Sequence, residues 1–270
     1  MNNNYLIENF HRDGYLIIEN LFNHNDLDEY YKSIKTIADI KYSAILNPDR
    51  HDYLIAQSND YIYKNDNLSE RLDKLNELEK ISSFTKKIIQ QYNVVNIIST
   101  ILKSEISYLM SQMLFKEAFS YYSGQAWSPH QDNSYIDSDT PNHPNGLNTQ
   151  YITTNLFFDN ANKENGSLYV YPGSHKLGKL KCDYIQSYRE SENSRPGNQI
   201  NPILYTNFDK LDLEFKKGSL LIINGNLIHG SYPNTSNKSR PLLSASYISR
   251  GSYFFEGKNA GRKENFIEIS

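Results

Sequence analysis

The sequence has very little cysteine, no excess of positive charge and no long hydrophobic run. The single cysteine, Cys182, cannot form an intramolecular disulfide, which favours the reducing cytoplasm as the compartment. A formal net charge of −3 lacks the basic excess of a nucleic-acid surface, so we expect no nucleic-acid partner. The apolar run at residues 220–223 is far shorter than a membrane span, and residues 1–13 lack the basic-then-apolar pattern of a signal peptide. We therefore expect a cytoplasmic protein that does not enter a membrane.

Aromatic residues are plentiful by contrast. The 22 Tyr and 12 Phe supply bulky side chains for a core, although only 38% of the 270 residues are hydrophobic. A chain of this length suits one domain, residues 1–270. Helical periodicity predominates in residues 1–105 and short β-branched segments in residues 106–250. Helices followed by many short strands predict an α+β fold, in which residues 106–250 close a two-sheet barrel and the N-terminal helices pack on one sheet.

Local signals divide the two parts further. Residues 67–81 begin with a capping box, Asn67 followed by Glu70, and carry leucines at helical spacing, so we predict one helix there. Residues 47–65 have no clear period and are predicted to form a loop with strand fragments. The other predicted helices are 5–12, 24–40 and 84–102, and the predicted strands are 15–18, 106–117, 150–159, 167–171, 219–224 and 242–248.

A polar segment, residues 183–202, interrupts the predicted strands. Long insertions of this kind are commonly lids or substrate loops. A solvated excursion without a binding role explains the same composition equally well. Both interpretations stay open at this point.

One short motif, His130-Gln131-Asp132, has the composition of a metal site. Side chains alternate across a strand, so residues two apart on an extended segment face the same side. An imidazole and a carboxylate placed in this way can reach one metal ion. The alternative is a surface pair or a structural histidine, because an isolated His-x-Asp motif is weak evidence for a metal.

A third ligand would complete the face of two histidines and one carboxylate that holds ferrous iron and leaves positions open. His229, which follows the apolar run at residues 220–223, is the candidate, and a core or loop histidine is its alternative. The remaining histidines have no matching partner in the sequence and are interpreted as structural or incidental: His11, His24, His51, His143 and His175.

Arg240 and Ser231 are predicted to form a receptor for a carboxylate. Arg240 follows the turn of residues 232–235, and a hairpin there would return it beside Ser231 on the adjacent strand. A guanidinium fork and a hydroxyl group together bind a carboxylate in bidentate fashion. A surface ion pair is the alternative role for Arg240.

Together with residues 165–176, Asn-Gly-Ser-Leu-Tyr-Val-Tyr-Pro-Gly-Ser-His-Lys, these motifs resemble the phytanoyl-CoA dioxygenase family. Residues 10–22 are also similar to the family's opening helix, strand and helix, so the resemblance extends from about residue 10 to residue 248. It implies a double-stranded β-helix (jelly-roll) core. It also implies an oxygenase that requires iron(II), 2-oxoglutarate and O2.

The family pattern implies roles for two groups of residues. The iron ligands would be His130, Asp132 and His229. The residues that contact 2-oxoglutarate would be Arg240, Ser231 and Gln112. Two features depart from the pattern: Ser128-Pro129 directly before the first ligand, which puts the pocket edge near Trp127 in doubt, and the segment 183–202, which matches nothing in the family.

The reaction implied is hydroxylation of an unactivated C–H bond of a small polar or anionic metabolite, with release of succinate and CO2. Asp132 favours hydroxylation, because related halogenases lack this carboxylate and bind halide in its place. Residues predicted to line the substrate pocket are Trp127, Asn133, Tyr135, Asn155 and Arg250. Candidates for recognising an anionic group are Arg189, Arg195 and Arg250, with surface salt bridges as their alternative role.

Two other functions fit parts of the sequence. A non-catalytic jelly-roll protein that binds a ligand beside a vestigial metal site would be favoured by an incomplete ligand set, whereas this set is complete. A cupin-type enzyme that uses another metal without 2-oxoglutarate would leave Arg240 and Ser231 without a role.

Overall fold

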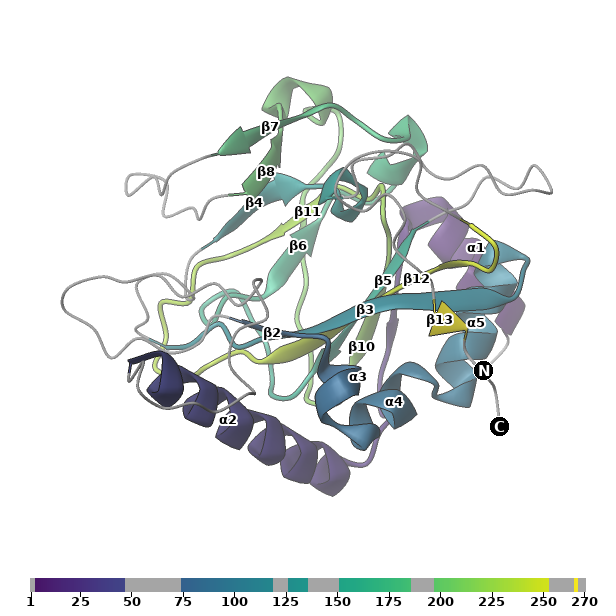
Figure 1. Ribbon diagram of the computed structural model, residues 1–270. Coiled ribbons are helices and arrows are strands. Elements are labelled where there is room, and N and C mark those ends of the chain that lie inside the picture. Colours follow the sequence, from purple (N-terminus) through teal and green to yellow (C-terminus); the bar gives the residue numbers. More distant parts are fainter. Residues whose placement is uncertain are drawn as a thin grey trace.

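The computed structural model describes residues 3–46, 74–118, 126–135, 151–185, 197–252 and 265–266. Two antiparallel sheets pack face to face, and the helices cover the outer side of the larger sheet (Figure 1). This arrangement is the predicted α+β jelly roll with helices on one sheet. The predicted loop at residues 47–65 lies outside the described residues.

The larger sheet has seven strands in the order β1-β10-β5-β12-β3-β13, and β2 also pairs with β3. The buried middle strands β5, β10 and β12 have no exposed residue, which explains why they lack a simple apolar–polar alternation. The strand bounds are β1 Tyr15–Ile18, β2 Lys74–Asn76, β3 Ile106–Leu114, β5 Ile152–Phe157, β10 Leu220–Asn224, β12 Leu242–Ser249 and β13 Asn265–Phe266.

The smaller sheet has four strands in the order β4-β11-β6-β9. Its bounds are β4 Trp127–His130, β11 His229–Ser231, β6 Leu168–Val170 and β9 Leu211–Asp212. Short 3-10 helices in the described residues flank these strands: η1 Asp132–Tyr135, η2 Ser174–Leu177 and η4 Pro202–Leu204. These strands are short, and β4 and β11 carry the two histidines of the site described below.

The helices and the smaller sheet bury opposite faces of the larger sheet. Leu156 and Ile222 pack with the helices, whereas Phe157 and Leu221 pack with Leu168 of the smaller sheet. Neighbouring residues on a strand point to opposite sides, so each strand contributes to both cores. The helix bounds are α1 Asn3–Asp13, α2 His24–Leu46, α3 Leu78–Ile81, α4 Ser83–Ile89 and α5 Tyr92–Leu102. Among the described residues, no helix is long and apolar enough to span a membrane.

The predicted helix at residues 67–81 is confirmed only at its C-terminal end and is wrong at residues 74–76. Residues Lys74–Asn76 form β2, and only Leu78–Ile81 are helical. Leu75 is fully buried opposite Met113 of β3, so pairing with the edge of the sheet outweighs a helical pattern of leucines. Residues 67–73 lie outside the described residues.

The predicted helix at residues 84–102 is two helices, α4 and α5. The break falls at Gln90 and Gln91, where the Gln91 side chain accepts a hydrogen bond from the backbone N–H of Val94 at 2.9 Å. An amide side chain that caps a new helix start in this way ends the preceding helix. The periodicity alone continues across this break, which is why the sequence predicted one helix.

The polar segment 183–202 is anchored by a second small sheet. β7 (Cys182–Ile185) and β8 (Gly197–Ile200) pair antiparallel, from Cys182 opposite Ile200 to Ile185 opposite Gly197. In Figure 1 this pair lies beside β4. The two ends of the segment therefore form strands, although the sequence predicted no strand there. Residues 186–196 lie outside the described residues.

Helix α1 offers a direct test of this packing. Phe10 is fully buried in the core under the larger sheet, whereas Tyr5 on the same helix is 63% exposed. We expect Phe10→Ala to lower the free energy of unfolding by about 3–5 kcal/mol, because it leaves a cavity. Tyr5→Ala should change it by less than about 0.5 kcal/mol. Urea denaturation of both variants measures this difference, and equal losses would show that α1 does not pack as described.

Candidate metal centre and anion pocket

The two candidate histidine ligands lie on adjacent antiparallel strands of the smaller sheet. β11 pairs with β4 so that His229 stands opposite His130, and their ring centroids are 4.5 Å apart. Val170, which pairs with His229 from the other side, packs into the core between the two sheets. Directly paired residues share one face of a sheet, so both imidazoles point into the barrel.

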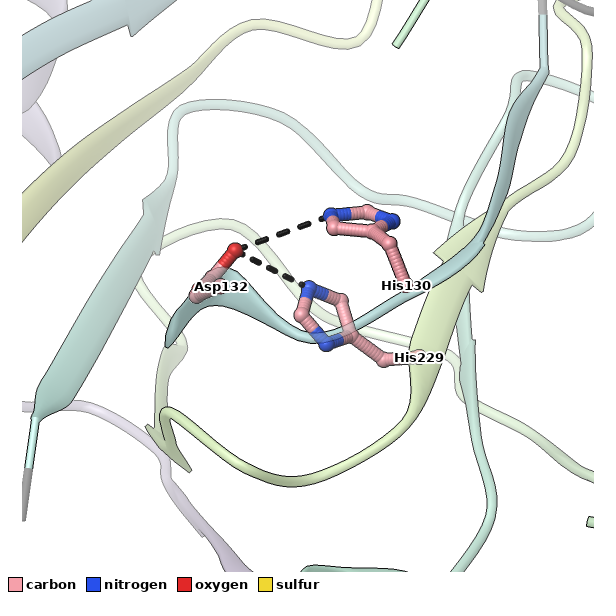
Figure 2. A group of neighbouring side chains, drawn as sticks. All are labelled: His130, Asp132 and His229. Atoms are coloured by element: carbon pink, nitrogen blue, oxygen red, sulfur yellow. Dashed lines mark ion pairs between the residues drawn. The ribbon is translucent and has the colours of Figure 1, made fainter. Parts of the chain in front are cut away.

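Asp132 reaches the same point from a turn (Figure 2). Its Oδ1 lies 3.6 Å from His130 Nε2 and 3.5 Å from His229 Nε2, and the three ligand atoms are all within 4.8 Å of one another. The sequence predicted His130 and Asp132 on one extended strand. That local prediction is wrong, because β4 ends at His130 and Asp132 begins the 3-10 helix η1, but the side chains still converge.

Backbone carbonyl groups fix the orientation of both imidazoles. His130 Nδ1 lies 2.7 Å from the carbonyl oxygen of Ser128, and His229 Nδ1 lies 3.0 Å from that of Leu227. A carbonyl oxygen only accepts, so each Nδ1 carries the proton and donates it. Each Nε2 therefore faces Asp132 with its lone pair, which is the arrangement that a metal-binding histidine needs.

The charges of these groups favour a cation between them. Burial lowers the pKa of His130, and the nearby His229 adds to this effect. Burial would raise the pKa of Asp132, but the two histidines outweigh it and hold that pKa far below its usual range. Burial would likewise lower the pKa of His229, yet the Asp132 carboxylate outweighs it and raises that pKa. Asp132 is thus ionised, and its negative charge beside two imidazole nitrogens favours a metal cation at this point.

The donor set fits ferrous iron. Two neutral imidazoles and one carboxylate on one side of an ion leave its other positions open, which is the face that non-haem iron oxygenases use. A structural zinc site would close all four positions, and the described residues supply three ligands within reach. Bound ferrous iron would be held by His130, Asp132 and His229.

Gln131, between the two ligands of the motif, points away from them and clamps the surrounding loops. Its Nε2 donates to the carbonyl oxygens of Gly178 at 2.8 Å and Asn226 at 2.7 Å, and its Oε1 accepts from the N–H of Leu180 at 2.8 Å. Asn226 directly precedes the segment that leads to His229. This fully buried amide therefore fixes the distance between the two ligand-bearing loops.

Arg240 is a buried cation with an open donor. Only 2% of the residue is exposed, its Nε donates to the Gly166 carbonyl oxygen at 3.1 Å, and its Nη1 has no partner among the described residues. Burial lowers the pKa of Arg240 to about 9, so the guanidinium remains charged at neutral pH. A buried charge is stable only when it is paired, and this one therefore calls for an anion.

Ser231 is connected to this arginine by a different route from the one predicted. The sequence predicted a hairpin that places Arg240 and Ser231 on adjacent strands. Instead β11 belongs to the smaller sheet, and Arg240 leads into β12 of the larger one. The two residues approach through shared neighbours, Lys116 and Gly166, because each sheet delivers one side of the pocket.

Gln112 and Asn155 face the interior between the sheets. Ser244 of β12 pairs with Gln112 of β3 on one side and with Asn155 of β5 on the other. Two residues further along each strand, the side chains of Leu114, Leu242 and Phe157 pack in the core between the sheets. Residues two apart share a face, so this row of amide and hydroxyl groups lines the same interior as the histidines.

The other predicted pocket residues divide into two groups. The Trp127 ring lies 5.7 Å from the His130 ring, at the edge of the site. The Asn133 amide donates to Asn226 Oδ1 at 2.8 Å, and Arg250 forms an ion pair with Glu105 at 2.8 Å with half of its side chain exposed. These contacts give both residues structural roles. Four other predicted or considered residues lie outside the described part of the structure, as does the side chain of Tyr135: Arg189, Arg195, His51 and His143.

Sequence reasoning missed Gln131 as a clamp, Gly166 as the partner of Arg240 and Lys116 as the partner of Ser231. The Asn165-Gly166 pair was visible only as a turn signal. Lys116 follows strand β3 and is only 3% exposed. A lysine inside the predicted strand 106–117 was the available signal.

Replacing Gln131 tests the clamp. We expect the isosteric Gln131→Glu substitution to weaken iron(II) affinity by about 10-fold or more, because a carboxylate oxygen would face two carbonyl oxygens and separate the ligand loops. Gln90→Glu, the same change at the end of α4, is the matched control and should bind iron(II) as wild type does. Anaerobic iron(II) titration measures both. Unchanged affinity in Gln131→Glu would remove Gln131 from the support of the site.

Comparison with known proteins agrees with this site. The model of the phytanoyl-CoA dioxygenase (PhyH) family matches residues 10–242. A phytanoyl-CoA dioxygenase domain-containing protein 1 homolog from Caenorhabditis elegans is 28% identical over 265 residues, which cover 87% of each chain. An ectoine dioxygenase from Nocardia farcinica is 24% identical over 235 residues, which cover 84% of this chain and 72% of that protein.

Solved structures share the fold at lower identity. EctD from S. alaskensis with 2-oxoglutarate and 5-hydroxyectoine superposes with a TM-score of 0.68 at 15% identity, covering 98% of this chain and 86% of that one. The epimerase SnoN in complex with Fe3+, alpha ketoglutarate and nogalamycin RO has a TM-score of 0.67 at 12% identity, covering 99% and 95%. The chain therefore belongs to the phytanoyl-CoA dioxygenase family and is an iron- and 2-oxoglutarate-dependent dioxygenase.

Proposed function

We propose that this protein hydroxylates an unactivated C–H bond of a small polar metabolite. Iron(II) would be held by His130, Asp132 and His229, and the distal carboxylate of 2-oxoglutarate would be received by Arg240 and Ser231. The observation that carries this proposal is the charged, buried Arg240, whose Nη1 has no partner in the described part of the chain, in a barrel that also contains the three candidate ligands. A ligand that binds a metal at one end and offers a carboxylate at the other satisfies both sites.

The overall reaction balances with O2 as oxidant. One oxygen atom enters the substrate C–H bond to give the alcohol, and the other enters 2-oxoglutarate, which becomes succinate and CO2. The C–H bond and the 2-oxo acid each supply two electrons. Bound iron(II) and 2-oxoglutarate supply the oxygen activation.

The protein's own residues orient the metal ligands and shield them from bulk water. The carbonyl groups of Ser128 and Leu227 hold the imidazoles in place, and Gln131 fixes the spacing of the two loops. His130 and His229 are 6% and 5% exposed, so the site is largely removed from bulk water. Ligands held in this way do not need to reorganise during the reaction.

The interior wall supports a polar substrate. Beside the row of Gln112, Ser244 and Asn155 runs a second row in which Ser246 pairs with Thr153, and Thr153 Oγ1 has no hydrogen-bond partner among the described residues. Buried polar groups without a protein partner favour a ligand that supplies hydrogen bonds. Relatives of the chain include two ectoine dioxygenases, whose name indicates the small polar substrate ectoine.

One further feature supports hydroxylation as the reaction, and another supports the cytoplasm as the compartment. Asp132 occupies the metal face, so no position there is vacant for a halide in place of a carboxylate. Cys182 is a free thiol, which suits a reducing compartment.

The metal role of His130 has a direct spectroscopic test. Adding iron(II) and then 2-oxoglutarate without oxygen should produce a visible charge-transfer band in the wild-type protein, and His130→Ala should give none. His24→Ala, an exposed histidine outside the site, should keep the band. With O2 and a screen of polar metabolites, substrate should raise succinate release. A wild-type protein that shows no band and releases no succinate would contradict the proposed function.

Arg240→Met separates an anion receptor from a structural ion pair. We expect 2-oxoglutarate to bind about 100-fold more weakly, because the buried charge that would receive its carboxylate is gone. Iron(II) affinity should stay as in wild type. The ligand-free protein should unfold at an equal or higher temperature, because an unpaired buried charge is replaced by an apolar chain of similar length. A large loss of stability with unchanged 2-oxoglutarate affinity would assign Arg240 a structural role.

A further inference from the structure

Lys116 is a buried lysine that reaches the anion pocket. It follows β3, is 3% exposed, and its Nζ donates a hydrogen bond to Ser231 Oγ at 2.9 Å. Its backbone adopts φ +40°, a conformation that L residues rarely hold without support. That support comes from its own carbonyl oxygen, which accepts from the N–H of Arg240 at 3.1 Å and from Asn234 Nδ2 at 2.9 Å.

The contacts of Ser231 determine where its hydroxyl proton points. Ser231 Oγ accepts from Lys116 Nζ and, at 3.4 Å, from the backbone N–H of Trp127. A hydroxyl group has two acceptor lone pairs and one donor hydrogen. With both lone pairs engaged, only the hydrogen is left for another partner, and no described residue accepts it. Ser231 is thereby prepared to donate to an anion.

Gly166 brings the lysine and the arginine to one place. A Cβ at Gly166 would lie 2.2 Å from Lys116 Cε and 2.8 Å from Lys116 Cδ, so the lysine stem passes where a side chain would otherwise stand. The Gly166 carbonyl oxygen accepts from Arg240 Nε at 3.1 Å. Gly166 thus makes room for the Lys116 side chain and orients the Arg240 guanidinium.

We propose that Lys116 is a positioning and specificity residue for the distal carboxylate of the 2-oxo acid co-substrate. It acts through Ser231, whose hydroxyl proton it directs toward the carboxylate. The pocket thereby selects a dicarboxylic 2-oxo acid over a monocarboxylic one. This inference rests on the proposed use of 2-oxoglutarate.

The test compares two ligands that differ only at the distal end. 2-Oxoglutarate and 2-oxovalerate present the same 2-oxo acid to the iron, but 2-oxovalerate ends in a methyl group. Both are titrated anaerobically into the iron(II)-loaded protein. A purely structural effect of a substitution lowers both affinities alike, whereas loss of carboxylate recognition lowers only the affinity for 2-oxoglutarate.

We expect Lys116→Met to weaken 2-oxoglutarate binding about 10-fold, because one charge-assisted hydrogen bond is lost, and to leave 2-oxovalerate within about twofold. Lys116→Arg should restore most of the preference. Lys35→Met is the matched control: Lys35 pairs with Glu117, the residue next to Lys116, and should leave both affinities unchanged. If Lys116→Met fails to fold, Lys116→Gln keeps a polar chain and is expected to lose the same discrimination.

The double variant Lys116→Met with Ser231→Ala tests the route through the serine. If Lys116 acts through Ser231, the double variant should lose less than the product of the two single losses. Equal weakening of both ligands by Lys116→Met, or no weakening of either, would overturn this inference and leave the proposed function intact. A wild-type protein that binds iron(II) but not 2-oxoglutarate would overturn both.

Discussion

The antiparallel pairing of β4 with β11 is the constraint on which the site depends. It sets His130 directly opposite His229, and Ser231 opposite Trp127 with an irregularity of register between the two pairs. A slip of one residue would turn either imidazole to the outer face of the sheet, because side chains alternate. The backbone contacts of the two Nδ1 atoms and the Gln131 clamp then fix what the register has brought together. A few short strands of the smaller sheet thus carry the metal face, while the larger sheet and its helices supply most of the buried apolar core.

The second constraint is the charge that the barrel interior holds at two places. Asp132 keeps its negative charge between two buried histidines, and Arg240 keeps its positive charge with an open Nη1. The first place favours a cation, and the second favours an anion. A metal ion and a dicarboxylic acid bound together would pair both charges. This pairing explains why the two charged sites share one barrel.

The sequence predicted the parts of the fold whose pattern is local. The strand at residues 15–18, the central strands and the long second helix follow from composition and periodicity, and each lies where it was expected. The helix predicted through Leu75 failed, because the edge of β3 offers pairing that a helical pattern of leucines does not reveal. The site shows the same division. His130, Asp132 and His229 were identified by residue type and spacing, yet the turn that delivers Asp132 and the separate sheets of Ser231 and Arg240 depend on long-range packing. Lys116 and Gly166 carry no motif of their own, so only their contacts reveal them.

The most direct measurement is a crystal structure of the protein grown without oxygen in the presence of iron(II) and 2-oxoglutarate. The account predicts one iron ion bound by Nε2 of His130, Nε2 of His229 and a carboxylate oxygen of Asp132. It also predicts the distal carboxylate of 2-oxoglutarate within hydrogen-bonding distance of Arg240 Nη1 and Ser231 Oγ. An iron ion held by other residues, or a 2-oxoglutarate whose distal carboxylate avoids Arg240, would contradict it.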